Sequence, residues 1–470
     1  MKIKTTIKYI ALAGVMLLNS ICMPVHATKS DTETFWPKGP SVESQSAIVM
    51  EASTGTVLYG KNINKKRYPA SITKIMTTLL AVENSEMNET VTFSADAVYS
   101  IDRGSTHIAR DVDEQMTMEE TLYAVMLGSA NECAYATGEH VGGGGSYRNF
   151  IDMMNERAKE LGCENTHFNN AHGLPDDNHY TTAYDMALIS RAAIQNETFK
   201  LITGTDKYTI PPTNKHKEST PITNHHAMLT FYKTSQHLYD YCIGGKTGYT
   251  NAARNTLVTY AEKDGMTLIC VVMKAETPNH YTDTRKLLDY CFDNFQLYKI
   301  SENEKTYSDD HIGNYMTFDG NNPIFSLDDE GVIVLPKSAA FEEASPQISY
   351  DGADAESGVA ATLEYFYGNR RVGGTQIKVE ESKVEEFLFG NESGVKEDGT
   401  EQKVIEVKWQ WIVFGGVAFV VLAGLIALAI YLSRNFYIIR HNMRMRKRDK
   451  MRRLHFKEKR RRRRIRRHRR

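Results

Sequence analysis

The sequence predicts an α+β fold, in which helices pack against an antiparallel sheet, followed by a small β-rich domain, a C-terminal transmembrane helix and a basic tail. Three consecutive apolar segments, 243–250, 255–261 and 266–273, have the length and composition of strands, and residues 263–265 (Lys-Asp-Gly) join the last two as a hairpin turn. Several earlier segments carry apolar residues at helical spacing. Helices together with an antiparallel sheet define the α+β class.

The first 27 residues have the pattern of a secretory signal peptide. Three lysines precede an apolar run over residues 9–18, and Val25-His26-Ala27 has the small residues of a cleavage site. The apolar run is too short to span a bilayer as an uncleaved anchor. We therefore expect residues 1–27 to be removed on export.

A second apolar segment, 409–433, contains no charged residue and is long enough to cross a bilayer of about 30 Å. Its aromatic residues near both ends suit the membrane interfaces. Residues 434–470 contain 20 Lys or Arg and only two acidic residues. Because basic flanks stay in the cytoplasm, the sequence predicts a single-pass cell-membrane protein with a cytoplasmic tail and an extracellular domain before residue 409.

The formal net charge of −1 hides a strong separation of charge. Residues 28–408 carry 34 Lys or Arg and 56 Asp or Glu, a net charge of about −22, while the tail is strongly basic. A basic run can bind nucleic acid, but one that follows a membrane span meets anionic lipid first. We therefore expect membrane lipid, and not nucleic acid, as the partner of the tail.

Five cysteines remain after the signal peptide, and an odd number cannot all pair within one chain. Their apolar neighbours predict buried small side chains and not disulfides. The five are Cys133, Cys163, Cys242, Cys270 and Cys291. Neither CxxC nor HExxH occurs despite 15 histidines, so we expect no metal site and no cofactor.

The N-terminal elements follow from local patterns. Apolar runs 46–50 and 56–59 flank Ser53-Thr54-Gly55, which predicts a β-hairpin. A helix then begins at Ser71, and its apolar stripe must face a core. The stripe consists of Ile72, Ile75, Met76, Leu79 and Leu80. Thr117-Met118-Glu119-Glu120 is a capping box that starts another helix, which stops at Gly128.

The remaining elements complete one domain over residues 28–300. Further helices are expected over 146–161, from Thr182 onward and over 282–295, whereas residues 196–240 are expected to be rich in loops.

Short apolar strands between acidic and glycine residues predict a small β-rich domain over 301–390. Those strands are 332–335, 361–367 and 374–379, and residues 391–408 form a polar linker to the membrane.

Ser71 and Lys74 are three residues apart at the start of the first helix, so they share one helix face. A serine hydroxyl is a poor nucleophile until a base removes its proton, and a desolvated, neutral lysine can be that base. Alone, such a pair is more often a capping serine beside a solvated lysine. Its interpretation therefore depends on further motifs.

Two such motifs follow in order. Ser129-Ala130-Asn131 lies on the link after the Thr117 helix, where side chains can point into a cleft, and Lys246-Thr247-Gly248 lies on a predicted strand. Glycine at position 248 permits close approach of a ligand to an edge strand. S-x-x-K, S-D-N and K-T-G together form the set shared by penicillin-binding proteins and class A β-lactamases, and this chain has Ser-Ala-Asn at the second motif.

With these motifs the chain resembles the low-molecular-mass D-alanyl-D-alanine carboxypeptidases, a branch of the penicillin-binding proteins. The resemblance covers about residues 40–296, including the surroundings of the motifs at 69–74 and 180–187, and extends loosely over the β-rich part. It implies a β-lactamase/transpeptidase-like domain and a stalk domain. It also implies removal of the terminal D-alanine from peptidoglycan stem peptides through a serine acyl-enzyme, with β-lactams as inhibitors.

The resemblance assigns roles to residues of this sequence. Ser71 would attack the carbonyl between the two D-alanines while Lys74 takes its proton. Ser129 would pass a proton to the departing amine, and Asn131 would hold the substrate amide. Lys246 would lend positive potential and Thr247 would bind the terminal carboxylate. The backbone N–H groups of Ser71 and Tyr249 would form the oxyanion hole.

Two other functions fit parts of the pattern. A class A β-lactamase needs a glutamate to activate water, and Glu160 and Glu164 are the only ones near the expected distance after Asn131, neither in a Glu-x-x-Leu-Asn setting. A non-hydrolytic β-lactam or peptidoglycan sensor would signal through its membrane span. Hydrolysis of a D-Ala-D-Ala peptide separates these alternatives.

One family feature is missing. Relatives supply an arginine beyond the strand that follows the K-T-G strand, and residues 277–281 (Thr-Pro-Asn-His-Tyr) occupy that place here. A carboxylate in a partly dry cleft still needs a donor. We expect His280 or Arg254 to substitute, unless Thr247 with Lys246 suffices.

Overall fold

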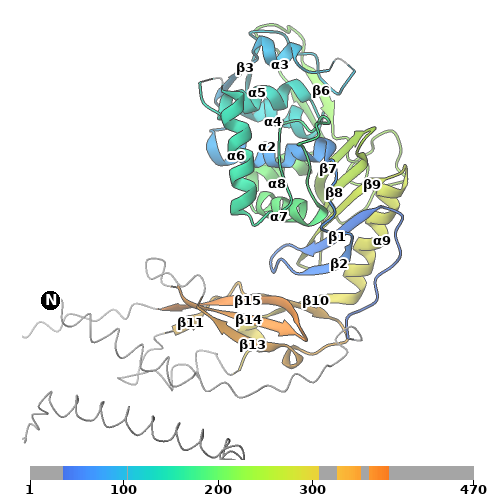
Figure 1. Cartoon of the computed structure of the whole chain (residues 1–470), viewed down its shortest axis with the longest axis vertical. Coiled ribbons are helices and arrows are strands. Elements are labelled where there is room, and N and C mark those ends of the chain that lie inside the picture. The colour runs from blue at the N-terminus through green and yellow to red at the C-terminus, as the bar shows by residue number, and fades with distance from the viewer. Residues whose placement is uncertain (1–34, 103, 145, 306–324, 351–358, 380–470) are drawn as a thin grey trace, which may run out of the picture. The chain divides into compact units, whose positions relative to one another are not determined.

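The computed structural model describes residues 35–102, 104–144, 146–305, 325–350 and 359–379 (Figure 1). The predicted signal peptide, the linker 391–408, the apolar segment 409–433 and the basic tail all lie outside the described residues. Within the described ranges, no helix has both the length and the apolar character to cross a membrane.

A five-stranded antiparallel sheet forms the frame of the first domain, with the strand order β2-β1-β9-β8-β7. Its strands are β1 (Ser46–Glu51), β2 (Val57–Lys61), β7 (Cys242–Thr250), β8 (Arg254–Lys263) and β9 (Met266–Ala275). The predicted hairpins are confirmed: β1 pairs with β2, and β8 pairs with β9. Asp264 and Gly265 have φ angles of 50° and 77°, as the tight turn between β8 and β9 requires. Strand β7 lies at the sheet edge, so it can face a ligand.

Helices cover both faces of this sheet (Figure 1). The 3₁₀ turn η1 (Ala70–Thr73) leads into α2 (Lys74–Asn84). The other helices of this domain are α3 (Ala95–Tyr99), α4 (Met118–Met126), α5 (Asn131–Val141), α6 (Tyr147–Glu160), α7 (Ala183–Ile194), α8 (Glu197–Gly204) and α9 (Asn279–Asn294). The capping box at Thr117 and the caps at Ser146 and Thr182 are present as predicted.

Alternation along the strands divides the core into two parts. On β8, Val258 packs with α2, α4, α5 and α7, whereas its neighbour Leu257 packs with α9 on the opposite face. The first eight residues of α2 are all buried, so this helix lies inside the domain and not on its surface. The five cysteines of the described chain are buried and free, as their apolar neighbours predict.

The segment 196–240 is more regular than the sequence indicates. It contains helix α8, whose first turn is capped by Asn196, and a hairpin of β5 (Lys207–Ile210) and β6 (Thr220–Thr223). Another short pair, β3 (Thr90–Thr92) and β4 (Gln115–Thr117), was also not predicted. Elements of three to eight residues carry too few periodic positions to be distinguished from loops.

The second domain is a separate antiparallel sheet with the order β10-β12-β15-β14-β13, and β11 pairs with β15. Its strands are β10 (Phe295–Lys299), β11 (Phe325–Leu327), β12 (Val332–Pro336), β13 (Ser345–Ser349), β14 (Val359–Tyr367) and β15 (Arg370–Val379), with the short helices α10 (Ile300–Asn303) and η2 (Phe341–Glu343). Strand β10 follows α9 directly, so this sheet starts before the predicted boundary at residue 301.

Candidate active site

Ser71 lies on the 3₁₀ turn η1, one turn before α2, and not within the α-helix itself. Two contacts fix this turn. The Thr256 hydroxyl donates to the Pro69 carbonyl at 2.8 Å, and Gly173 approaches so closely that a Cβ there would lie 1.9 Å from the Ala70 carbonyl oxygen. Ala70 itself has a φ of 52°, in the left-handed region. The turn that carries the nucleophile is therefore held by two other segments of the chain.

Lys74 is the first residue of α2 and is fully buried. Its ammonium nitrogen lies 3.2 Å from Ser71 Oγ, 2.6 Å from Asn131 Oδ1 and 2.8 Å from the His172 carbonyl oxygen. Burial, and then the charge of Lys246, lower the pKa of Lys74 well below its usual value. A lysine that loses its proton this readily can act as a base toward the hydroxyl it contacts.

The second motif faces the first across the site. Ser129 has a φ of 56° on the link between α4 and α5, and Asn131 opens α5. While Asn131 Oδ1 accepts from Lys74, its Nδ2 donates to Ser105 Oγ at 2.9 Å. The Asn131 amide is thereby oriented, with its oxygen toward the lysine.

Strand β7 closes the site with the third motif. Lys246 is buried, its ammonium donates to the Thr247 carbonyl at 3.1 Å, and burial lowers its pKa to about 7. A Cβ at Gly248 would lie 2.8 Å from the Ser71 backbone nitrogen, so only glycine lets the strand come this close. The strand backbone and the Ser71 N–H therefore meet at one point, as an oxyanion hole requires.

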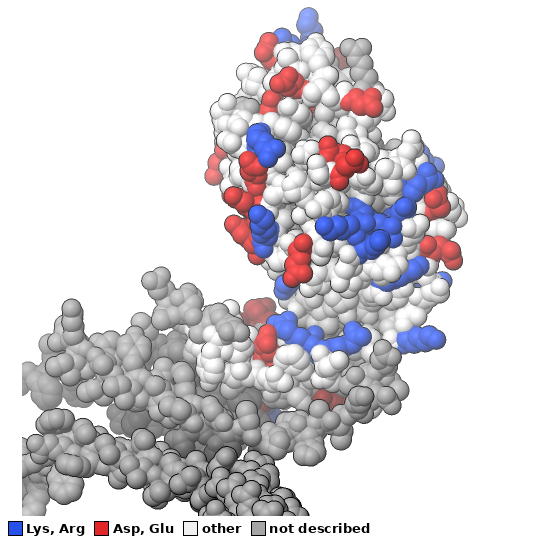
Figure 2. Space-filling model, in the orientation of Figure 1, with Lys and Arg blue, Asp and Glu red and all other residues white. Residues whose placement is uncertain are grey.

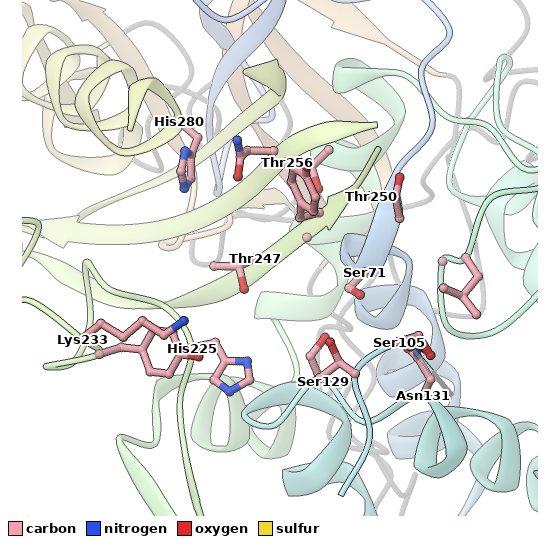
Figure 3. A pocket seen from close by; sticks show the side chains of 18 of the residues that line it. Ser71, Ser105, Ser129, Asn131, His225, Lys233, Thr247, Thr250, Thr256 and His280 are labelled. Carbon is pink, nitrogen blue, oxygen red and sulfur yellow. Dashed lines mark hydrogen bonds between the residues drawn. The ribbon is translucent and has the colours of Figure 1, made fainter. Parts of the chain in front are cut away.

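These groups open into one cavity of about 450 Å³ (Figure 3). Ser71 lines it from η1, Ser129 and Asn131 from the α4–α5 link and the start of α5, Thr247 and Tyr249 from β7, and His280 from α9. Most of these side chains are polar, so the cavity suits a hydrogen-bonding substrate.

Comparison with known proteins assigns the chain to a family. The family model described as D-alanyl-D-alanine carboxypeptidase matches residues 33–277, more than half of the chain. The chain belongs to the D-alanyl-D-alanine carboxypeptidase family. It is 34% identical over 271 residues to D-alanyl-D-alanine carboxypeptidase DacF of Bacillus subtilis, covering 56% of this chain and 66% of that one. It is 27% identical over 377 residues to DacC of Escherichia coli, covering 75% and 87%.

Solved structures of the same family share the fold of the first domain. A Streptomyces DD-transpeptidase superposes with a TM-score of 0.50 at 29% identity, covering 55% of this chain and all of the other. A penicillin-binding protein homolog from Mycobacterium tuberculosis gives a TM-score of 0.50 at 27% identity, covering 55% and 94%. The β-lactamase/transpeptidase-like fold predicted for this domain is confirmed.

Of the two residues proposed to replace the family arginine, the structure brings only His280 into the cavity. Its burial lowers its pKa to about 4, so the imidazole is neutral near pH 7. Arg254 is not among the residues that line the cavity, because its Nε donates to Glu276 at 2.9 Å and its Nη1 to the Tyr249 hydroxyl at 3.2 Å. The carboxypeptidase cavity thus contains a neutral imidazole at this place and not a guanidinium.

Sequence reasoning missed three contributors. The His172 carbonyl accepts from Lys74, Ser105 orients Asn131, and Lys233 lines the cavity next to His225. A backbone carbonyl leaves no residue-type signal, and Lys233 stands in a segment without periodicity. For Ser105, the only hint is its place in a polar loop before the α4 helix.

The glutamates that a β-lactamase would need are not in the site. Glu160 is exposed and pairs with Arg157 at 3.0 Å, Glu164 is exposed, and neither lines the cavity.

A separate cluster of Asp111, Glu114 and His216 has the spacing of metal ligands. However, the Arg110 guanidinium already forms an ion pair with the buried Glu114 carboxylate at 2.8 Å. We therefore interpret the cluster as a structural ion-pair network and not as a metal site.

Proposed function

We propose that the chain is a membrane-anchored, extracellular serine-type D-alanyl-D-alanine carboxypeptidase that removes the terminal D-alanine of peptidoglycan stem peptides. One observation carries this proposal: a fully buried lysine ammonium lies 3.2 Å from the Ser71 hydroxyl and has no carboxylate partner in the described part of the chain. Such a lysine is neutralised easily and is placed to activate one specific hydroxyl.

Acylation follows from these contacts. Lys74 takes the Ser71 proton as Oγ attacks the carbonyl between the two D-alanines, and the developing oxyanion accepts from the N–H groups of Ser71 and Tyr249. When the C–N bond breaks, the proton passes from Lys74 through Ser129 to the amine of the leaving D-alanine. The products are an ester on Ser71 and free D-alanine.

Deacylation uses the same base. A water molecule that takes the place of the departed amine gives one proton to Lys74 as its oxygen attacks the ester. The ester C–O bond breaks, Ser71 regains a proton from Lys74, and the shortened peptide leaves. Since neither Glu160 nor Glu164 reaches the cavity, Lys74 is the base that we assign to both steps.

The terminal carboxylate of the substrate binds on the side of Thr247. His280 supplies a neutral N–H donor there, and Lys233 supplies the charge. Lys233 lines the same cavity, and no ion pair of its ammonium is found among the described residues. The ammonium lies 5.0 Å from the centre of the Tyr232 ring. In the view of Figure 3, Lys233, Thr247 and His280 all lie to the left of Ser71.

The location is proposed from the sequence. The signal pattern of residues 1–27, the uncharged apolar segment 409–433 and the basic tail support export, a single membrane span and a lipid-facing cytoplasmic tail. This arrangement would place the carboxypeptidase domain beside the cell wall, where D-Ala-D-Ala stem peptides occur.

The decisive experiment combines labelling and turnover. Fluorescent penicillin, a strained amide with a carboxylate, should label purified wild-type protein covalently at Ser71 and should not label Ser71→Ala. The wild type should also release D-alanine from a D-Ala-D-Ala peptide. Labelling without any release would favour the β-lactam sensor, and rapid hydrolysis of the penicillin itself would favour a β-lactamase.

A further inference from the structure

A second cavity, of about 310 Å³, lies beside the candidate active site and has a cationic lining. Lys66, Arg67 and Lys274 contribute three positive charges to it, and Asp177 contributes the one negative charge among its lining residues. The Asp177 carboxylate accepts from the Tyr68 hydroxyl at 3.2 Å. None of the three cations has a carboxylate within 4.0 Å in the part of the chain that the structure describes.

Arg67 makes this arrangement more than a solvated surface patch. It is partly buried, burial lowers its pKa, and the only side-chain hydrogen bond found for it in the described region runs from Nε to the Ser46 hydroxyl at 3.3 Å. Taking a guanidinium out of water costs free energy unless an anion compensates it. The two terminal nitrogens of Arg67 are therefore available to a ligand.

The lining is held in place before any ligand arrives. Arg67 exchanges both backbone hydrogen bonds with Thr181, at 2.8 and 2.9 Å. The Lys66 ammonium lies 4.2 Å from the centre of the Tyr180 ring, and Lys274 has a left-handed φ of 56° near the end of β9. A strained non-glycine residue persists only where the surrounding structure fixes it. Figure 2 shows Lys and Arg side chains gathered on the face where Figure 1 labels β1, β8 and β9.

The position of this cavity indicates which part of the substrate peptide it can contact. Along β7, Thr247 precedes Gly248, which contacts the Ser71 backbone, and Thr250 follows it on the other side of the nucleophile (Figure 3). The leaving D-alanine binds at Thr247, so the acyl part of the peptide must leave on the Thr250 side. Residues 252 and 253, just beyond Thr250, line the cationic cavity, and Tyr68 lies three residues before Ser71.

We propose that this cavity is a subsite for a carboxylate on the acyl side of the substrate peptide, within the residues that precede the two D-alanines. The inference rests on the proposed function and adds a preference to it: the enzyme selects stem peptides that carry a free carboxylate upstream of the scissile bond. Arg67 and Lys274 bind the carboxylate, Lys66 adds charge from the rim, and Ala252 and Ala253 leave room for the chain.

The test uses detergent-solubilised full-length protein and two peptide series ending in D-Ala-D-Ala. In the first series, one of the two residues before the D-alanines carries a side-chain carboxylate. In the second series, the same side chain is the corresponding amide. The wild type should prefer a carboxylate peptide in kcat/KM, and Lys66→Gln with Lys274→Gln, which leaves Arg67 in place, should reduce this preference by about fivefold to tenfold through KM. Lys65→Gln, an exposed neighbour that does not line the cavity, is the matched control and should keep the preference.

A second readout does not depend on turnover. Each peptide should slow fluorescent penicillin labelling of Ser71, and the carboxylate peptide should do so at lower concentration in wild type only. If the wild type cleaves no peptide but shows this difference, the proposed hydrolysis fails while the subsite stands. Equal behaviour of both series in wild type, or an equal loss for both in the double variant, overturns the subsite. If inorganic phosphate protects wild type but not the double variant from heating, and no carboxylate preference exists, the cavity holds phosphate and the assignment is wrong.

Discussion

Lys74 and Lys246 are both buried, and the charge of Lys246 lowers the pKa of Lys74 beyond the effect of burial alone. Neither lysine forms an ion pair in the described ranges. The pair therefore works by repulsion: a cation on β7 helps to keep the base on α2 without its proton. This relationship gives Lys246 a role in activating the nucleophile besides attracting the substrate carboxylate.

Removing the charge of Lys246 should shift the pH dependence of acylation. The neutral form of Lys74 is the base, so acylation rises as pH rises through the pKa of Lys74. In Lys246→Gln that pKa moves upward because a repelling charge is gone, and the acidic limb of the pH–rate profile for penicillin labelling moves to higher pH. Lys233→Gln, which removes a charge elsewhere in the cavity, should leave the limb in place. An unshifted limb in Lys246→Gln would show that burial alone sets the pKa.

Replacing Lys74 by arginine should abolish base catalysis while keeping a positive charge. A guanidinium does not lose its proton at any working pH, so acylation should fall by about a hundredfold to ten-thousandfold. Stopped-flow labelling with penicillin measures the rate, and thermal unfolding identifies variants that are simply misfolded. A folded variant that acylates at nearly the wild-type rate excludes Lys74 as the base.

Gly248→Ala should damage the site more than the fold. The new Cβ would lie 2.8 Å from the Ser71 nitrogen and 2.5 Å from Thr256 Oγ1, so the Ser71 turn must move. Overpacking of this kind costs about 1–3 kcal/mol of stability, and a displaced oxyanion hole should slow acylation by at least about tenfold. Gly265→Ala is the matched control: it strains a left-handed turn with nothing within 4 Å, so it should lose stability and keep its acylation rate. Equal acylation rates in the two variants would contradict the assigned role of the strand.

Catalytic groups can be predicted from the sequence where they are side chains of characteristic type and order. They cannot be predicted where only the fold brings a group into the site. Ser71, Lys74, Asn131 and the motif on β7 are recognisable because their residue types and order are unusual together. The contact of the His172 carbonyl with Lys74 could not be predicted from the sequence, since every residue has a backbone carbonyl. Arg254 was a reasonable candidate by distance along the chain, but its partner Glu276 is 22 residues away, and only the β8–β9 pairing brings them together.

The topology predicted from the sequence can be tested in intact cells. Residues 28–400 expressed alone should be soluble and active on small peptides, because every motif precedes the apolar segment. Protease added outside the cells should cut residues 300–405 and spare the arginine-rich tail, as detected with antibodies to each part. Protection of the first region together with cleavage of the tail would reverse the orientation.

The final prediction concerns the cation that binds the terminal carboxylate. At pH 7 His280 is neutral, and Arg254 is engaged by Glu276 outside the cavity. Lys233 remains as the cavity residue that is charged and without an ion pair in the described chain. Its charge, after burial and the charge of Lys246, also lowers the pKa of His225, which places the two side chains within electrostatic reach.

The measurement compares kcat/KM for a D-Ala-D-Ala peptide and its C-terminal amide. Lys233→Gln should reduce the preference for the free carboxylate by about tenfold, the loss expected for one charge-assisted hydrogen bond of about 1.5 kcal/mol or more. His280→Ala should reduce it less, because a neutral donor contributes less than a charged one, and Arg254→Ala should leave it unchanged. Penicillin carries an equivalent carboxylate, so the labelling rate of Lys233→Gln should fall in parallel. If Arg254→Ala alone loses the preference, the ion pair with Glu276 must open when substrate binds, and the assignment to Lys233 is wrong.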